Sequence, residues 1–243
     1  MNIPARRALV TGGSGDIGGA IARALAAQGC EVLVHANGHR ARAEEVAATI
    51  LAEGGAAHAV VFDLTDAAAT RAAIEGELEG GPIQILVHNA GVHDDAPLAG
   101  MSEAQWHRVI DVSLHGFFHA TQPLLLPMAR TRWGRIVSVS SVAAVLGNRG
   151  QTNYAAAKSA LHGATRSLAR EMASRGISVN VVAPGVIAGR MADGTFDAAS
   201  IKAMVPAARA GTADEVAALV AFLCSDAAGY INGQVIGING GMG

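Results

Sequence analysis

The stretch ALVTGGSGDIGGAIARALAAQG, residues 8–29, decides the fold. Its apolar run at 8–11 predicts a buried strand, and the small apolar residues from 17 onward predict a helix. The turn between them is rich in glycine. Such a turn lets backbone N–H groups and the helix N-terminus approach a pyrophosphate. The alternative is an ordinary tight turn, because glycine closes those as well.

The rest of the chain repeats this alternation of strand and helix. Further short apolar runs, most of them rich in Val and Ile, lie at 31–35, 57–62, 83–88, 135–140, 177–182 and 234–238. Helical patterns lie near 17–28, 40–53, 66–79, 102–130, 152–174 and 213–224. This order predicts a single α/β domain over 1–243, a Rossmann-like, doubly wound parallel sheet of about seven strands with helices on both faces. Ligands of such sheets bind beyond the carboxyl ends of the strands.

Composition narrows the class of protein. The net charge of −2 argues against nucleic acid as a partner. No 18-residue apolar window is free of charge, which predicts no membrane span. The N-terminus enters a strand pattern without a signal-peptide core, and Cys30 and Cys224 stand alone in apolar surroundings. These features predict a cytoplasmic protein with reduced cysteines. The nine histidines have no metal-ligand spacing, so no metal is expected.

Residues after the later strands suit a nucleotide. No Asp or Glu follows the second strand to hold a ribose 2′-hydroxyl, whereas Asn37, His39 and Arg40 could meet a 2′-phosphate. This favours NADP over NAD; alternatively, Arg40 only solvates the start of a helix. Asp63 after the third strand could accept a hydrogen bond from the adenine amino group or cap the next helix. The small residues at 89–91 let a loop pass close under a bound cofactor.

Tyr154 and Lys158 are four residues apart and therefore share a helix face. Ser140 and Ser141 end the fifth strand and can meet them at one crevice. An ammonium group lowers the pKa of a nearby tyrosine, and carbonyl reduction needs an acid to protonate the alkoxide. A lowering of about three pKa units corresponds to roughly 4 kcal/mol and requires a partly dry site with the positive ring of the oxidised cofactor. The alternative is a packed core tyrosine beside a solvated lysine.

Taken together, several motifs resemble the short-chain dehydrogenase/reductase family over essentially the whole chain. They are Thr11–Gly18, Asn89-Ala90-Gly91, Ser141, Tyr154-Ala-Ala-Ala-Lys158, Pro184-Gly185 and the Asn-Gly-Gly at 239–241. Within the family, the stretches at 135–161 and 168–187 are most similar to bacterial 3-oxoacyl-[acyl-carrier-protein] reductases.

The resemblance implies a role for each matching residue. Tyr154 is the expected proton donor, Ser141 holds the substrate oxygen, and Lys158 grips the nicotinamide ribose and lowers the tyrosine's pKa. Ser113 occupies the relay position of the family. With Asn37, His39 and Arg40, the implied cofactor-binding set is Gly12, Ser14, Gly15, Asp16, Ile17, Gly18, Asp63, Leu64, Asn89, Ala90, Gly91, Tyr154, Lys158, Pro184, Gly185 and Ile187.

Three positions depart from the family pattern. Asp16 replaces the middle glycine of the loop, where a carboxylate near a pyrophosphate must point away. Ser113 replaces an asparagine that kinks a helix and holds a water in the proton relay; serine offers fewer hydrogen-bond sites, so the relay is expected to be weaker. Gly189 replaces a threonine, which removes one contact to the cofactor.

Charge and resemblance together suggest partners. Residues 130–175 hold eight Arg or Lys residues and one acid, Glu171, which suits an acidic partner. The resemblance implies that Arg132 and Arg175 dock acyl carrier protein; the alternative is a solvated helix face or subunit contacts. It also implies a homotetramer. The stretch around 188–206 is expected to form a lid over the substrate.

The sequence therefore predicts NADPH-dependent reduction of a 3-oxoacyl thioester on acyl carrier protein to the 3-hydroxyacyl thioester, in fatty-acid or related polyketide or polyene-type synthesis. One alternative is a short-chain reductase of another ketone or alcohol, such as a coenzyme A thioester or a sugar. A second is a catalytically impaired binding or assembly subunit, suggested by Asp16 and Ser113.

Overall fold

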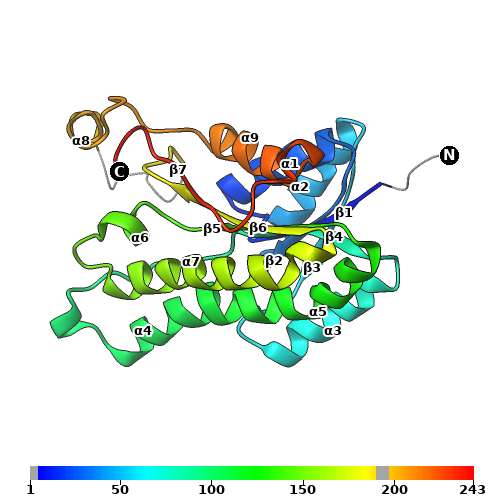
Figure 1. Ribbon diagram of the computed structural model, residues 1–243. Coiled ribbons are helices and arrows are strands. Elements are labelled where there is room, and N and C mark those ends of the chain that lie inside the picture. Colours follow the sequence, from blue (N-terminus) through cyan, green and yellow to red (C-terminus); the bar gives the residue numbers. More distant parts are fainter. Residues whose placement is uncertain (1–4, 190–196) are drawn as a thin grey trace.

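The computed structural model describes residues 5–189 and 197–243. One sheet of seven parallel strands has the order β3-β2-β1-β4-β5-β6-β7 (Figure 1). The strands are β1 (Arg7–Thr11), β2 (Glu31–Ala36), β3 (Ala56–Val61), β4 (Ile83–His88), β5 (Gly134–Val139), β6 (Ile177–Pro184) and β7 (Val235–Ile238). The order reverses between β1 and β4, which is where doubly wound sheets bind their ligands. The predicted fold class is confirmed.

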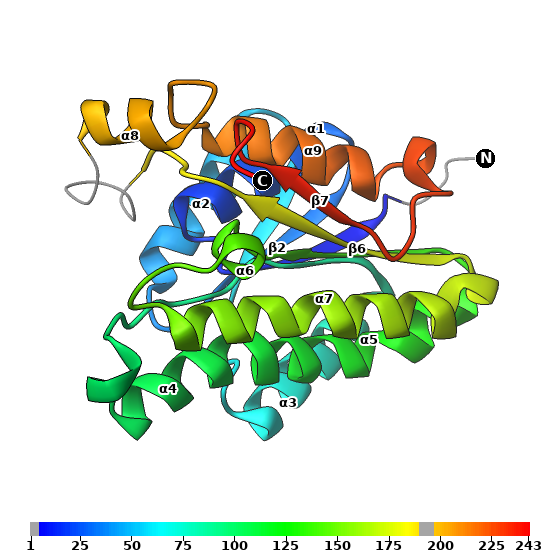
Figure 2. The same cartoon turned by 60° about the vertical axis from the view of Figure 1, so that its left-hand side comes forward.

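Helices cover both faces of the sheet (Figure 2). On one face lie α1 (Asp16–Ala27), α2 (Arg40–Ala52) and α9 (Ala213–Cys224); on the other lie α3 (Ala67–Leu78), α5 (Gly116–Thr131) and α7 (Thr152–Met172). Side chains alternate along each strand, so Ala8 and Val10 pack with α1 and α9 while Leu9 joins the core under α5 and α7. Burial on both faces explains why the strands are nearly continuous apolar runs.

The predicted helical stretch at 102–130 is not one regular helix. It divides into α4 (Glu103–Ile110), a π-helical turn at Asp111–His115, and α5. Short elements that the sequence pattern missed are α6 (Ala143–Leu146), α8 (Ala198–Met204) and 3₁₀ turns at Leu98–Gly100, Ala173–Arg175 and Asp226–Ala228. Helix α8 lies in the predicted lid, whose residues 190–196 are outside the described part of the chain.

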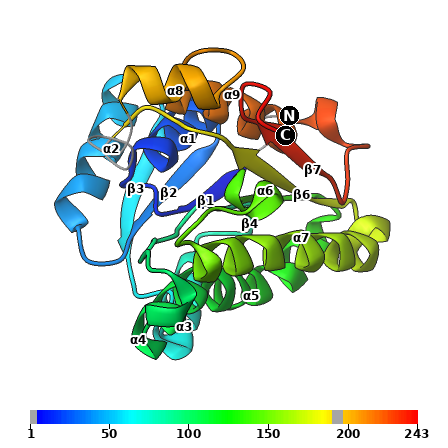
Figure 3. The same ribbon diagram turned by 90° about the vertical axis from the view of Figure 1, so that its left-hand side faces the viewer.

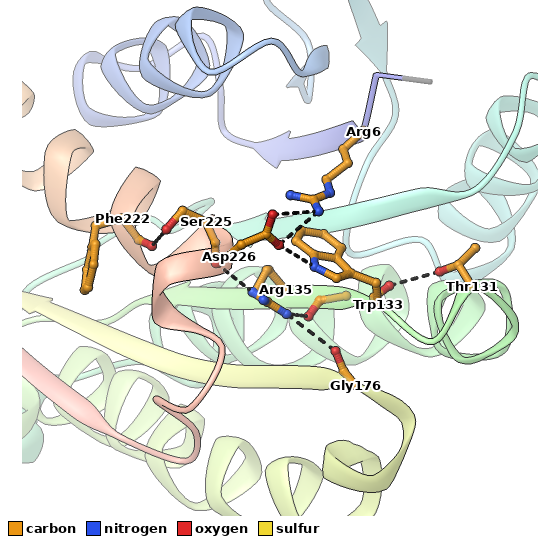
Figure 4. Close-up of polar contacts among 9 residues, drawn as sticks. Arg6, Thr131, Trp133, Arg135, Gly176, Phe222, Ser225 and Asp226 are labelled. Atoms are coloured by element: carbon orange, nitrogen blue, oxygen red, sulfur yellow. Dashed lines mark hydrogen bonds and ion pairs between the residues drawn. The ribbon is translucent and has the colours of Figure 1, made fainter. Parts of the chain in front are cut away.

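A polar cluster ties the amino ends of the strands together (Figure 4). The Trp133 ring lies between two guanidinium groups, with Cζ of Arg6 3.7 Å and Cζ of Arg135 4.3 Å from its centroid. Asp226, after α9, accepts from Arg6 and from Nε1 of Trp133, each at 2.9 Å. The carboxyl end of the sheet, which carries α6, α8 and the start of α7 (Figure 3), is therefore at the opposite end of the molecule.

Candidate active site

The glycine loop is shaped by contacts that only glycine allows. Gly12 has φ +63°, and its carbonyl accepts from the N–H of Gly15 at 3.1 Å just before α1 begins. A Cβ at Gly18 would overlap the Gly12 carbonyl oxygen and lie 2.7 Å from Nδ2 of Asn89. That amide donates to the carbonyls of Thr11 and Gly12, both at 3.1 Å. Asn89, predicted to lie beneath the cofactor, thus braces the loop from β4.

We expect Gly18→Ala to weaken NADPH binding by at least about tenfold, because the added methyl group displaces the loop, and to cost about 1–3 kcal/mol of stability. Fluorescence titration with NADPH and thermal unfolding measure the two effects. Gly76→Ala in α3, where a Cβ meets nothing within 4 Å, is the matched control and should bind NADPH normally. Equal affinities of Gly18→Ala and the parent protein would show that this close approach does not shape the site.

Tyr154 and Lys158 project from the first turns of α7 beside the end of β5. Nζ of Lys158 lies 5.8 Å from the Tyr154 ring centroid and donates to the Val139 carbonyl at 2.9 Å. Lys158 is buried, 2% exposed, whereas Tyr154 is partly buried. Ser141, which follows β5, hydrogen bonds with the side chain of Tyr154. The structure therefore brings the predicted serine, tyrosine and lysine together.

Electrostatics at this trio differ from the sequence prediction. Burial raises the pKa of Tyr154 above its ordinary value, Asp95 adds to the rise, and the Ser141 hydrogen bond opposes it. Burial also lowers the pKa of Lys158 to about 8. The protein's own groups thus do not make the phenol acidic, because desolvation outweighs the Ser141 hydrogen bond. The lowering of the tyrosine's pKa stays a prediction for the complex with an oxidised dinucleotide.

Ser113 and Gly91 complete the surroundings of Lys158. A Cβ at Gly91 would lie 2.9 Å from Nζ of Lys158 and 3.6 Å from Oγ of Ser113. The hydroxyl of Ser113 is fully buried and has no hydrogen-bond partner among the described residues. Such an unsatisfied polar group beside a buried amine is suited to a water or a sugar hydroxyl. The glycine cradle and this hydroxyl fit a dinucleotide that crosses the carboxyl ends of β1, β4 and β5.

Comparisons with known proteins agree with this geometry. A family model described as enoyl-(acyl carrier protein) reductase matches residues 13–243. The chain is 43% identical to the 3-oxoacyl-[acyl-carrier-protein] reductase FabG of Escherichia coli (strain K12), over 100% of this chain and 99% of that protein. The chain belongs to the short-chain dehydrogenase/reductase family. It is also 43% identical to FabG of Staphylococcus aureus (strain Mu50), over 98% of both chains, and 44% identical to nodulation protein G of Rhizobium sp. (strain N33), over 100% and 98%.

Two of the departures from the short-chain dehydrogenase/reductase pattern meet in space. Gly189 has φ +144°, and a Cβ there would lie 2.7 Å from Oδ2 of Asp16. The carboxylate of Asp16 thus fills the place that a side chain at position 189 would need. Because the two residues share one space, the threonine of the family pattern does not fit beside Asp16 without a shift of this loop.

The predicted 2′-phosphate residues are exposed. Asn37, His39 and Arg40 follow β2 at the surface, and Nη1 of Arg40 is 3.6 Å from Glu44 on the same helix. A groove of about 380 Å³ beside the glycine loop is lined by Arg42 rather than Arg40, together with Ser14, Gly15, Asp16, Arg23 and Asp214 among others. Sequence reasoning missed Arg42, because its position two residues into α2 gives no motif.

Asp63 does not cap the helix that follows it, so that alternative is wrong. Its Oδ1 accepts from the backbone N–H and hydroxyl of Thr65, each at 2.8 Å, while Asp66 caps α3. Oδ2 of Asp63 has no partner among the described residues, which is compatible with the predicted adenine contact. Leu64 beside it is buried.

The remaining predicted cofactor residues follow β6. Pro184 ends this strand, and its carbonyl accepts from the N–H of Val142 at 2.7 Å. The N–H of Gly185 donates to the carbonyl of Ile238 at 3.0 Å, and Ile187 lines a small cavity near α8. These residues therefore lie at the same end of the sheet as the glycine loop and the Ser141, Tyr154 and Lys158 trio.

His35 is a loop-holding residue that the sequence did not reveal. Its Nδ1 accepts from the N–H of Gly12 at 3.1 Å, and Nε2 donates to the Phe62 carbonyl at 2.9 Å. Burial lowers the pKa of His35 to about 4, so the ring stays neutral and Nδ1 can accept. A single buried histidine at the end of a strand gives no periodic or spacing signal.

Within residues 5–189 and 197–243 there is no group of three His, Cys, Asp or Glu side chains able to hold a metal ion. No helix in the same part of the chain is both long and apolar enough to cross a membrane. Cys30 and Cys224 are buried, unpaired thiols, and burial raises the pKa of both.

Proposed function

We propose that the protein is an NADPH-dependent 3-oxoacyl-[acyl-carrier-protein] reductase. The observation that carries the proposal is the meeting of Ser141, Tyr154 and a buried Lys158 beside the glycine cradle of Gly12 and Gly18. Relatives 42–44% identical over the chain's length, several of them named as reductases of this type, supply the substrate class.

The mechanism follows from the chemistry of these side chains. The glycine loop and Lys158 would hold a reduced nicotinamide dinucleotide, which would supply a hydride to the ketone carbon when bound. Ser141 donates a hydrogen bond to the carbonyl oxygen and orients it toward the phenol. As charge develops on that oxygen, the O–H bond of Tyr154 breaks and its proton goes to the alkoxide, which leaves a phenolate. Lys158 stabilises the phenolate and holds the ribose, and Ser113 passes a proton toward the phenolate.

A substrate panel tests the proposal. We expect turnover of 3-oxoacyl thioesters on acyl carrier protein with NADPH, slower turnover of the coenzyme A thioesters, and weak use of NADH. Preference for a sugar or another ketone would show that the natural substrate is not a 3-oxoacyl thioester. Failure to bind NADPH would favour a catalytically impaired assembly subunit.

Cofactor choice is tested by comparing the variants Arg40→Ala and Arg42→Ala. The variant that has lost the arginine contacting the 2′-phosphate should bind NADPH more weakly and NADH as before.

Docking of acyl carrier protein at Arg132 and Arg175 requires that the protein form an oligomer. The two lie close together, because Nη2 of Arg132 donates to the Ser174 carbonyl at 3.2 Å. Helix α7 has 21 residues and spans about 30 Å, so this basic corner is far from Tyr154 at the helix start. A carrier held there would serve the active site of another subunit. We therefore join the docking proposal to that of a homotetramer, supported by the exposed Phe118 and Leu126 on α5.

We expect the double variant Arg132→Glu, Arg175→Glu to lower kcat/KM for the carrier-bound substrate at least about tenfold, because charge reversal repels an acidic partner. The coenzyme A thioester should be reduced at an unchanged rate. Steady-state kinetics on both substrates make the comparison, and light scattering confirms that the assembly is intact. Equal losses on both substrates, or none on either, would contradict docking at this corner.

Two further predictions go with this proposal. The stretch 188–206, which includes α8, is proposed to cover the acyl substrate. A cytoplasmic location is proposed from the buried, reduced cysteines.

A further inference from the structure

His88, the last residue of β4, is a fully buried histidine to which the mechanism above gives no task. Its Nε2 lies 2.8 Å from the carbonyl oxygen of Ser113, and its Nδ1 lies 3.4 Å from Oγ1 of Thr11. A carbonyl only accepts, so Nε2 carries the proton and Nδ1 can accept from the threonine. Burial, helped by the charge of Lys158, lowers the pKa of His88 to about 3, which keeps the ring neutral.

The carbonyl that His88 holds belongs to the π-helical turn between α4 and α5. The family pattern places an asparagine at 113 to kink this helix, yet the turn is present with serine in its place. The His88 ring also meets Phe117 edge-on, with centroids 5.6 Å apart. One side chain from the sheet therefore contacts the turn and the beginning of α5 that follows it.

The place of this turn determines where the Ser113 hydroxyl lies. A Cβ at Gly91 would lie close to both that hydroxyl and Nζ of Lys158. Among residues 5–189 and 197–243, the lysine has a hydrogen-bond partner, the Val139 carbonyl, and the hydroxyl has none. If the turn moved along the sheet, the distance between the serine hydroxyl and the amine would change. The hydrogen bond from His88, on the rigid strand β4, to the Ser113 carbonyl prevents such a shift.

We propose that His88 is a positioning residue for the reduction. It holds the π-helical turn from β4 and so keeps the Ser113 hydroxyl beside Lys158. Serine is shorter than the asparagine of the family pattern, and its own side chain cannot hold the turn. The inference rests on the proposed function, because a relay next to Lys158 matters only if Tyr154 must regain a proton. The neutral imidazole itself does not touch the reacting atoms.

The first test is His88→Phe, which keeps a ring against Phe117 and removes both hydrogen bonds. We expect kcat to fall about 10- to 100-fold, since a small displacement near a reacting centre has effects of that size. KM for NADPH should change little, because the glycine loop is also held by Asn89 and His35. A loss confined to KM, or no loss, would overturn the proposal.

Conservative variants separate the two hydrogen bonds. The amide of His88→Gln reaches about as far as imidazole Nε2 and can donate to the Ser113 carbonyl, so kcat should largely recover. The amide of His88→Asn ends near the position of Nδ1 and should not rescue. Adding Ser113→Asn to His88→Phe should restore part of kcat, because the helix then holds the turn itself. Rescue by Asn but not Gln would contradict the assigned contact.

A stability control and a second readout complete the experiment. Asn180→Leu removes two buried hydrogen bonds of β6, to Ile231 and from Gln234, and should lower the melting temperature without lowering kcat. Hydrogen exchange of the amides at 111–116 should be faster in His88→Phe than in either the parent protein or Asn180→Leu. Unchanged exchange would show that His88 does not hold the π-helical turn, whatever substrate the protein reduces. Failure to reduce any 3-oxoacyl substrate would refute the proposed function and would leave the exchange measurement unaffected.

Discussion

Tyr154→Phe is expected to lower turnover by about 10²- to 10⁴-fold while NADPH still binds, the size of effect typical of losing a general acid. In free energy of activation this is about 3–5 kcal/mol. The substitution removes only the hydroxyl, so the ring that packs near Lys158 remains and Ser141 loses a single hydrogen bond. Because burial keeps the pKa of Tyr154 above its ordinary value, the phenol is fully protonated at neutral pH and available as the donor.

The loss of nicotinamide absorbance with a 3-oxoacyl substrate measures this effect, and NADPH fluorescence shows that the cofactor site is intact. The chain's other tyrosine supplies the control: Tyr230 is fully exposed, and Tyr230→Phe should turn over at the parent rate. A folded Tyr154→Phe protein that consumes NADPH as fast as the parent would falsify the assignment of the proton donor.

The fold could be predicted because each strand and each long helix leaves a pattern along its whole length in the sequence. Runs such as 31–35 and 177–182 are buried on both faces of the sheet, and this is what made them continuous in the sequence. The π-helical turn at 111–115 could not be predicted in the same way. A turn of five residues is too short to have an apolar spacing of its own, so the pattern of 102–130 resembles that of one helix.

Site residues could be predicted where they belong to a sequence motif, and not where they lie outside one. Ser141, Tyr154 and Lys158 have fixed spacing and meet as expected. His35 and His88 each make two buried contacts, one through each ring nitrogen, and packing creates these contacts, so no sequence pattern reveals them. The direction of the Tyr154 pKa shift was likewise out of reach, because desolvation depends on how closely other residues pack around the phenol.

Lys158→Met should remove activity and yet alter stability in a way that depends on pH. We expect turnover to fall on the order of 100-fold or more, because the ribose and the phenolate both lose their cation. Burial holds the pKa of Lys158 at about 8, against 10.5 for an ordinary lysine. Below pH 8 the amine is charged in both states, and the folded protein carries the whole cost of burying that charge.

The sign of the pH effect follows from proton binding. Between pH 8 and 10.5 the unfolded chain keeps a proton that folded Lys158 has released, so the parent protein gains stability as pH rises. The gain is about 3 kcal/mol over this window, and methionine has no such titration. At pH 7 the variant should be more stable by roughly 1 kcal/mol. It no longer buries a charged amine, and losing the hydrogen bond to the Val139 carbonyl cancels part of that gain.

Thermal and denaturant unfolding of the two proteins at pH 7 to 10.5 test this expectation. The melting temperature of Lys158→Met should begin about 2–4 °C above that of the parent and fall below it as the pH rises. Lys202, the only other lysine in the chain, is exposed on α8, and Lys202→Met should show the parent's pH dependence. If the difference in melting temperature between Lys158→Met and the parent stays constant with pH, burial does not lower the pKa of Lys158. An active site that keeps a destabilising charge is then excluded for this protein.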